Sequence, residues 1–266
     1  MRIRYVVSTM IFWWRETRLS LEQECQFLRS LGFGVELWPS IRGLDDCRYE
    51  RRNWARLKAA TDGMLVAMRT RNDRPSLEQW DEQLQCAKML GAHLVADLPS
   101  LRISQNLDRD GYDFAAEVIH RATTSGVSLC LETGPLPVMK KAGEVFDSLR
   151  YCLDTGHANL DPDHDFKQYV DALAPRISHL HLTDNYGFID DHERPGLAGG
   201  IARENWDYLL ETLMRFDNDI IGSFEMCPCM PGVMIRQAGE FIFGTLNWPN
   251  PPHQTPTDVR QLYHPF

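Results

Sequence analysis

The sequence lacks the features that mark membrane-bound, secreted and nucleic-acid-binding proteins. No apolar run reaches membrane-spanning length, and no small-residue cleavage site follows the short apolar stretch near the N-terminus. Basic residues are the minority, 28 against 37 acidic ones, and the net charge of −9 disfavours a protein that binds the phosphate backbone of nucleic acids. The seven cysteines form an odd and sparse set, so we predict reduced thiols in a cytoplasmic protein.

A glycine-rich turn is also missing after the first predicted strand, where the sequence reads STMIFWW. An open doubly wound sheet normally carries such a turn at its nucleotide site, so this fold is disfavoured. The chain instead alternates short apolar runs with longer segments of helical periodicity. The eight runs predicted to be strands span residues 4–8, 34–38, 64–68, 93–97, 127–132, 151–155, 177–183 and 220–226.

Eight such units in about 250 residues predict an α/β fold, a single (β/α)8 TIM barrel. We assign residues 1–246 to this barrel because no linker or low-complexity tract interrupts them. Residues 247–266 contain five prolines and no periodicity, and they are predicted to be an extended tail. Such a tail could lie over the barrel or over a neighbouring subunit, so a homo-oligomer stays open.

Metal-type ligands stand at the ends of four predicted strands. Glu132 ends SLCLE, Asp154 lies in YCLDTGH, His181 lies in HLHLTD and Glu225 ends GSFE. Barrel active sites are assembled from strand carboxyl ends, so these side chains are expected to meet. Carboxylates after apolar residues are costly to bury without a partner, and a shared cation would supply one, although separate salt bridges are the alternative. The ligand set favours one divalent metal ion, Mn²⁺ first and Mg²⁺, Co²⁺ or Zn²⁺ as alternatives.

Other side chains are candidates for contacts to substrate or to a second metal. Asp190 and His192 follow the seventh predicted strand and either reach the pocket or lie on a solvated loop. Asp184 in the same loop is expected to converge on that strand end. Glu36 could contact substrate hydroxyls or form an ion pair below the barrel rim. Trp14, in the loop after the first predicted strand, could stack on a sugar face, plug the pocket rim or form a subunit contact.

These motifs resemble those of the xylose-isomerase-like barrels. That family includes sugar and sugar-phosphate isomerases and epimerases, inosose dehydratases and the endonuclease IV group. The resemblance rests mainly on the second half of the chain. Its motifs are GVELW at 34–38, LETG at 131–134, CLDTGHANL at 152–160, HLHLTDNYG at 179–187, DDH at 190–192 and SFEM at 223–226.

The resemblance implies roles for the residues at the strand ends. Glu132, Asp154, His181 and Glu225 would bind the metal, His157 would stand beside it facing substrate, and Glu132 and Glu225 would move protons. We therefore expect a metal-dependent isomerase or epimerase that acts on a sugar or related polyhydroxy carbonyl compound through an enediolate. A lyase or dehydratase using the same site is the alternative, followed by an endonuclease IV-like hydrolase and a non-catalytic sugar-binding barrel.

Two departures from the family pattern narrow these expectations. Gly187 stands where ketose 3-epimerases place a substrate-binding arginine, six residues beyond the metal histidine. Arg69 directly follows the third predicted strand and Asp97 ends the fourth, at places where the endonuclease relatives carry metal-binding histidines. Together with the acidic charge, the missing histidines disfavour DNA repair, and a small carbohydrate is the expected substrate.

Overall fold

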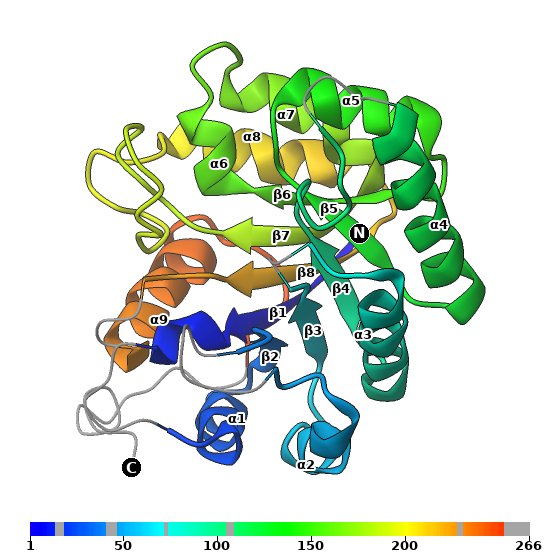
Figure 1. Ribbon diagram of the computed structural model, residues 1–266. Coiled ribbons are helices and arrows are strands. Elements are labelled where there is room, and N and C mark those ends of the chain that lie inside the picture. Colours follow the sequence, from blue (N-terminus) through cyan, green and yellow to red (C-terminus); the bar gives the residue numbers. More distant parts are fainter. Residues whose placement is uncertain (14–18, 41–46, 72–73, 105–108, 228–230, 253–266) are drawn as a thin grey trace.

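The computed structural model describes residues 1–13, 19–40, 47–71, 74–104, 109–227 and 231–252. Eight parallel strands follow one another around a closed barrel, and β8 pairs with β1 (Figure 1). The predicted (β/α)8 barrel is therefore confirmed. The strands are β1 (Arg2–Ser8), β2 (Gly34–Leu37), β3 (Val66–Arg69), β4 (His93–Ala96), β5 (Leu129–Glu132), β6 (Arg150–Asp154), β7 (Ile177–Leu182) and β8 (Asp219–Phe224).

Each strand overlaps its predicted segment, and the largest shifts are two residues, at the starts of β1, β3 and β5 and at the end of β8. β3 begins two residues later than predicted because its pairing with β2 starts at Val35 and Val66. Apolar composition continues into the preceding turn, so the sequence pattern alone does not show where pairing begins.

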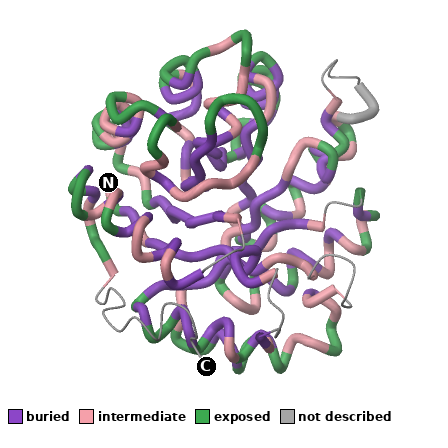
Figure 2. The backbone as a smooth tube through the Cα atoms, turned by 90° about the vertical axis from the view of Figure 1, so that its left-hand side faces the viewer, coloured by how far each residue is buried: buried purple, intermediate pink, exposed green. Residues whose placement is uncertain are grey.

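The helices lie around the outside of the barrel. The strands at the centre of the molecule are therefore buried (Figure 2). Capping boxes begin α1 and α3, as their sequences predict, with Ser20 and Gln23 bonded reciprocally at α1 and Ser76 and Gln79 at α3. The α-helices of the described chain are α1 (Leu21–Ser30), α2 (Trp54–Ala60), α3 (Leu77–Leu90), α4 (Arg109–Ser125), α5 (Leu136–Val145), α6 (Thr155–Leu160), α7 (Phe166–Leu173), α8 (Arg203–Leu213) and α9 (Pro231–Gly239). None of these helices is long and apolar enough to cross a membrane.

The predicted tail is described up to residue 252, and its first residues pack on the barrel. Trp248 is 2% exposed and lies edge-on to Trp206 of α8, with ring centroids 6.2 Å apart. The Pro249 carbonyl accepts a hydrogen bond from the Tyr5 hydroxyl at 2.9 Å. Residues 253–266 lie outside the described chain.

The barrel interior is packed so closely that a methyl group matters at Gly34. This residue lies between Val6 of β1 and Leu65, which precedes β3. A Cβ at Gly34 would press on the Leu65 carbonyl oxygen and would lie 2.9 Å from Val6 Cγ1. The glycine therefore allows β1, β2 and β3 to approach.

We predict that Gly34→Ala lowers the free energy of unfolding by roughly 1–3 kcal/mol, because strand backbone has to move to admit the methyl group. Gly244→Ala is the matched control, since that residue is exposed and nothing lies within 4 Å of the position that its added methyl group would take. The control should leave the unfolding free energy within about 0.5 kcal/mol of the wild type in urea titrations. Equal stability of the two variants would contradict this account of the barrel packing.

Candidate metal centre

The carboxyl ends of the strands place one layer of polar side chains inside the barrel. Side chains alternate between the two faces of a strand, so residues two positions beyond the inward-facing apolar ones also point inward. Ala67, Cys130 and Cys152 belong to small apolar clusters separate from the main core. The polar layer above them consists of Glu36, Arg69, Glu132, Asp154, His181 and Glu225, all buried.

His181 is the centre of this layer. Its Nδ1 lies 2.9 Å from Glu132 Oε1, 3.1 Å from Glu225 Oε2 and 3.5 Å from Asp154 Oδ2. The three carboxylates come from β5, β6 and the residue directly after β8. The structure therefore brings together all four residues that the sequence offered as a metal-ligand set, with ligand atoms within 4.8 Å of one another.

Asp154 is oriented by its neighbours so that one oxygen faces the cluster. Its Oδ1 accepts hydrogen bonds from the His157 amide at 2.9 Å and from the Thr183 hydroxyl at 3.1 Å. Its Oδ2, the atom nearer His181, accepts none within the described chain. The carboxylate is thus held in the direction in which it could act as a ligand.

The second nitrogen of His181 has its own partner. Nε2 lies 3.3 Å from Glu36 Oε2, and the same oxygen lies 2.8 Å from Nε2 of His179. Glu36 therefore forms the ion pair below the rim, which was one of its two predicted roles, and it is fully buried. When Glu36 accepts a hydrogen bond from Nε2–H, a neutral His181 keeps its lone pair on Nδ1, where it can bind a metal ion.

Arg69 joins the cluster from β3, a role that its departure from the endonuclease pattern did not predict. Its Nη1 contacts Glu132 Oε1, and its Nε lies 3.9 Å from Glu225 Oε1. The sequence did contain a feature that could have identified Arg69: it stands at a strand end, as the candidate ligands do. Asp97, at the corresponding place after β4, accepts a hydrogen bond from the Ser100 amide at 2.8 Å and so stabilises a turn.

The cluster shifts proton affinities in opposite directions. Burial alone would raise the pKa of Glu132, but Arg69 and His181 outweigh burial and hold it well below its usual range. At Glu225 burial prevails over the same two groups and raises the pKa. Burial disfavours the charged form of His181, yet the surrounding anionic groups raise its pKa well above the usual value.

The donor set fits a divalent cation. Both Glu225 carboxylate oxygens and one oxygen each of Glu36 and Asp154 accept no hydrogen bond from the described residues, although all are buried. Buried carboxylates of this kind are stabilised by a cation. Three carboxylates with one imidazole suit Mn²⁺, Mg²⁺, Co²⁺ or Zn²⁺.

His157, Asp190 and His192 form a second group at the rim of the cluster. Asp190 Oδ2 lies 3.1 Å from His157 Nε2 and 3.3 Å from His192 Nε2. Asp154 is the main reason that the pKa of His157 rises, to about 10. Asp190 is exposed and His192 is half-buried, and their contacts lie beside the cluster. A role for the two residues in the pocket stays a prediction.

The prediction that Asp184 converges on the strand end is wrong. Its carboxylate turns back into its own loop and accepts hydrogen bonds from the amides of Asn185, Gly196, Leu197 and Ile201. The backbone of Asp184 also pairs with that of Glu193. Asp184 therefore closes the loop that carries Asp190 and His192, which extends beyond the strand ends in Figure 1 (yellow).

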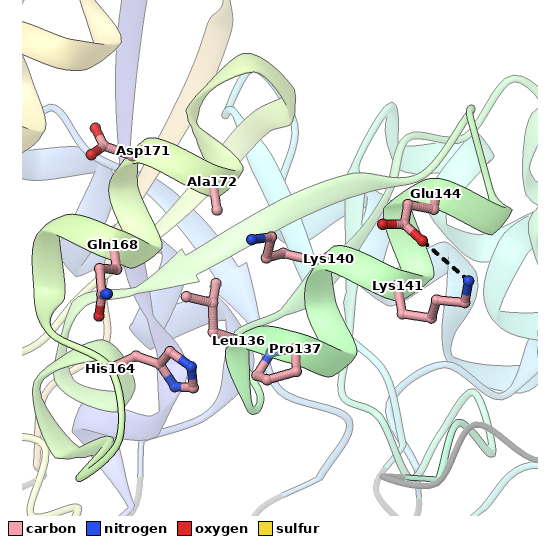
Figure 3. Close-up of a pocket in the computed structure, with 9 residues that line it drawn as sticks. All are labelled: Leu136, Pro137, Lys140, Lys141, Glu144, His164, Gln168, Asp171 and Ala172. Carbon is pink, nitrogen blue, oxygen red and sulfur yellow. Dashed lines mark hydrogen bonds and ion pairs between the residues drawn. The ribbon is translucent and has the colours of Figure 1, made fainter.

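Trp14, the remaining predicted pocket residue, lies outside the described residues. The described chain has a groove of about 640 Å³ on its outer surface, between α5 and α7 (Figure 3). Lys141 and Glu144 form an ion pair there at 3.1 Å. None of the residues lining this groove belongs to the candidate metal centre.

Fold and side chains together define a (β/α)8 barrel with a metal-type ligand cluster at its carboxyl end. The chain belongs to the xylose isomerase-like TIM barrel family, whose model matches residues 65–238. No curated protein matches the sequence significantly.

Several solved structures share the fold. A D-tagatose 3-epimerase-like protein has a TM-score of 0.66 at 17% identity, over 92% of this chain and 98% of the other. The apo 3-keto-D-glucoside 4-epimerase YcjR from E. coli has a TM-score of 0.63 at 14% identity, over 92% and 99%. The D-allulose 3-epimerase from Methylomonas sp. has a TM-score of 0.58 at 12% identity, over 98% and 94%. At these identities the likeness establishes the fold.

We predict that Asp184→Ala destabilises the loop after β7, because it leaves four loop amides without their buried acceptor. The free energy of unfolding should fall by roughly 2–4 kcal/mol, and limited proteolysis should cut within residues 185–201. Asp163→Ala, at an exposed position, is the control and should behave like the wild type. Unchanged protease resistance in Asp184→Ala would show that other contacts hold the loop.

Proposed function

We propose that this protein is a divalent-metal-dependent isomerase or epimerase that acts on a sugar or related polyhydroxy carbonyl compound through an enediolate. The observation that carries this proposal is the approach of Glu132, Glu225 and Asp154 to His181 Nδ1, at 2.9, 3.1 and 3.5 Å. Carboxylates on both sides of a substrate carbon can remove a proton from one face and return one to the other. We propose a small carbohydrate as the substrate and the cytoplasm as the location of the enzyme.

Each residue of the cluster has a role in this scheme. Arg69 and His181 contact Glu132 Oε1, which leaves Oε2 to take the proton next to the carbonyl. Glu225, whose pKa is raised by burial, returns a proton on the opposite face. A bound divalent cation would supply Lewis-acid stabilisation of the negative charge on the substrate oxygens. His157, held by Asp190 at 3.1 Å, stands where it could donate a proton to a substrate oxygen.

The comparisons support the same class of reaction. Proteins named as 3-epimerases and as a 4-epimerase share this barrel over nearly its whole length. Gly187 departs from the ketose 3-epimerase pattern, so the substrate is proposed only as a polyhydroxy carbonyl compound. A lyase would begin with the same proton removal and would differ by expelling a β-substituent.

The first test is metal-dependent proton exchange. Protein with Mn²⁺, incubated in deuterated water with a panel of ketoses, inososes and 3-keto-glycosides, should incorporate deuterium next to the carbonyl of its substrate. A strong chelator should abolish the exchange and Mn²⁺ should restore it, because a carboxylate removes such a weakly acidic proton only when the product charge is stabilised. An unchanged skeleton identifies an isomerase or epimerase, and release of water or an aglycone identifies a lyase. Cleavage of abasic DNA with no exchange on any of these compounds would refute the proposal.

The second test concerns the two glutamates. Glu132→Gln and Glu225→Gln should each lower the exchange rate by about 10²–10⁴ at saturating Mn²⁺, since the amide cannot accept the proton. In metal-free protein Glu225→Gln should leave the melting temperature nearly unchanged, because this carboxylate accepts no hydrogen bond from the described chain. Glu132→Gln should lower it, because Arg69 loses its closest partner. Glu193→Gln, in the neighbouring loop, is the control. Full exchange by Glu225→Gln would remove that residue from the scheme.

A further inference from the structure

We infer that Arg69 is a positioning residue that sets how strongly the candidate metal centre binds a divalent cation, an inference that rests on the proposed function. Arg69 is the last residue of β3 and points into the barrel at the level of the ligands. Its guanidinium contacts Glu132 and approaches Glu225, and these carboxylates are two of the four proposed ligands. A guanidinium and a metal ion would therefore neutralise the same negative charges.

The charge of Arg69 is permanent and fixed in place. Arginine keeps its proton in proteins, so this cation cannot be removed by deprotonation. The residue is 7% exposed, and its guanidinium carbon lies 5.1 Å from the centre of the Trp38 ring. Trp38 is itself held by a hydrogen bond of 2.8 Å from its indole nitrogen to Ser8 Oγ and by edge contact with Trp13. The Trp38 ring thus adds a cation–π contact that helps to hold the guanidinium in place.

Two effects of Arg69 on metal affinity oppose each other. Its positive charge repels a second cation bound to the same carboxylates, whereas its contacts restrict the rotamers of Glu132 and Glu225 and so prepare the site. In a buried site, the repulsion energy between a unit positive charge and a nearby divalent ion is large. It exceeds the conformational free energy that is saved when the rotamers of two glutamates are already restricted. Removal of the charge should therefore tighten metal binding.

The same contact should stabilise the protein when no metal is bound. Without Arg69, the positive partners of Glu132, Asp154 and Glu225 among the described residues would be histidines: His181 and the rim residues His157 and His192. Buried charges without compensation destabilise a fold strongly. Arg69 thus weakens cation binding and lowers the dependence of folding on the metal.

The test compares Arg69→Gln, Arg69→Lys and Arg48→Gln with the wild type, using chelator-stripped protein, titration calorimetry with MnCl₂, and thermal melts with and without Mn²⁺. Gln keeps an amide donor for Glu132 without the charge, and Lys keeps the charge. Arg48 is the control because it pairs with buried Glu24 at 3.2 Å, remote from the ligand set.

We expect Arg69→Gln to bind Mn²⁺ at least about tenfold more tightly than the wild type, and Arg69→Lys to stay within about threefold of it. The metal-free melting temperature should fall by roughly 5 °C or more in Arg69→Gln, and Mn²⁺ should restore most of the loss. Arg48→Gln should lose stability equally with and without Mn²⁺ and bind the metal like the wild type. If metal-free Arg69→Gln does not fold, recovery of the fold in Mn²⁺ supports the inference and failure to recover overturns it.

The inference and the proposed function fail in different ways. Wild-type or weaker Mn²⁺ affinity in Arg69→Gln, with binding lost in Glu132→Gln, would overturn the role of Arg69 and leave the metal centre intact. Equal tightening in Arg69→Lys would also overturn it, because the charge would then not be the cause. Absence of divalent-metal binding in every variant, the wild type included, would overturn both.

Discussion

The imidazole of His181 is the group on which the whole site depends. Three carboxylates from different strands approach its Nδ1 within 3.5 Å, and a fourth lies 3.3 Å from its Nε2. Carboxylates buried so close together repel one another, and leaving them without a cation costs several kcal/mol. Packing alone would favour apolar side chains at these positions. Their concentration at one end of the barrel, together with Arg69 and the rim histidines, is what a site for cation-assisted chemistry requires.

The barrel supplies the rigidity that this arrangement needs. The ligands stand on or directly after strands, whose direction is set by the parallel ladder around the closed sheet. Neighbouring side chains then fix the rotamers, as Thr183 and the His157 amide do for Asp154. The loop after β7 has little regular secondary structure. Its conformation is fixed instead by hydrogen bonds from four backbone amides to the Asp184 carboxylate. The rim residues Asp190 and His192 are therefore presented by a braced loop.

Family membership and chemistry rest on different observations here. Epimerases and an epimerase-like protein share this barrel at 12–17% sequence identity. Similarity at that level establishes the fold and does not identify a substrate. The differences bear on the chemistry: Arg69 stands where endonuclease relatives are expected to carry histidine, and its contact with Glu132 joins it to the ligand set. An arginine at that position brings a fixed positive charge to the cluster, whereas a histidine would bring another ligand.

The sequence by itself determined the barrel and the four residues of the candidate metal centre. Alternation along each strand, and an acidic residue or histidine at the end of strands five to eight, are local patterns, so Glu132, Asp154, His181 and Glu225 could be named from them. Only the tertiary structure decided that Glu36 takes the second nitrogen of His181, that Arg69 reaches Glu132 and Glu225, and that Asp184 turns away from the site. These contacts join strands that are not neighbours, or depend on one rotamer among several. They follow from the closure and register of the barrel, which no local pattern of residues encodes.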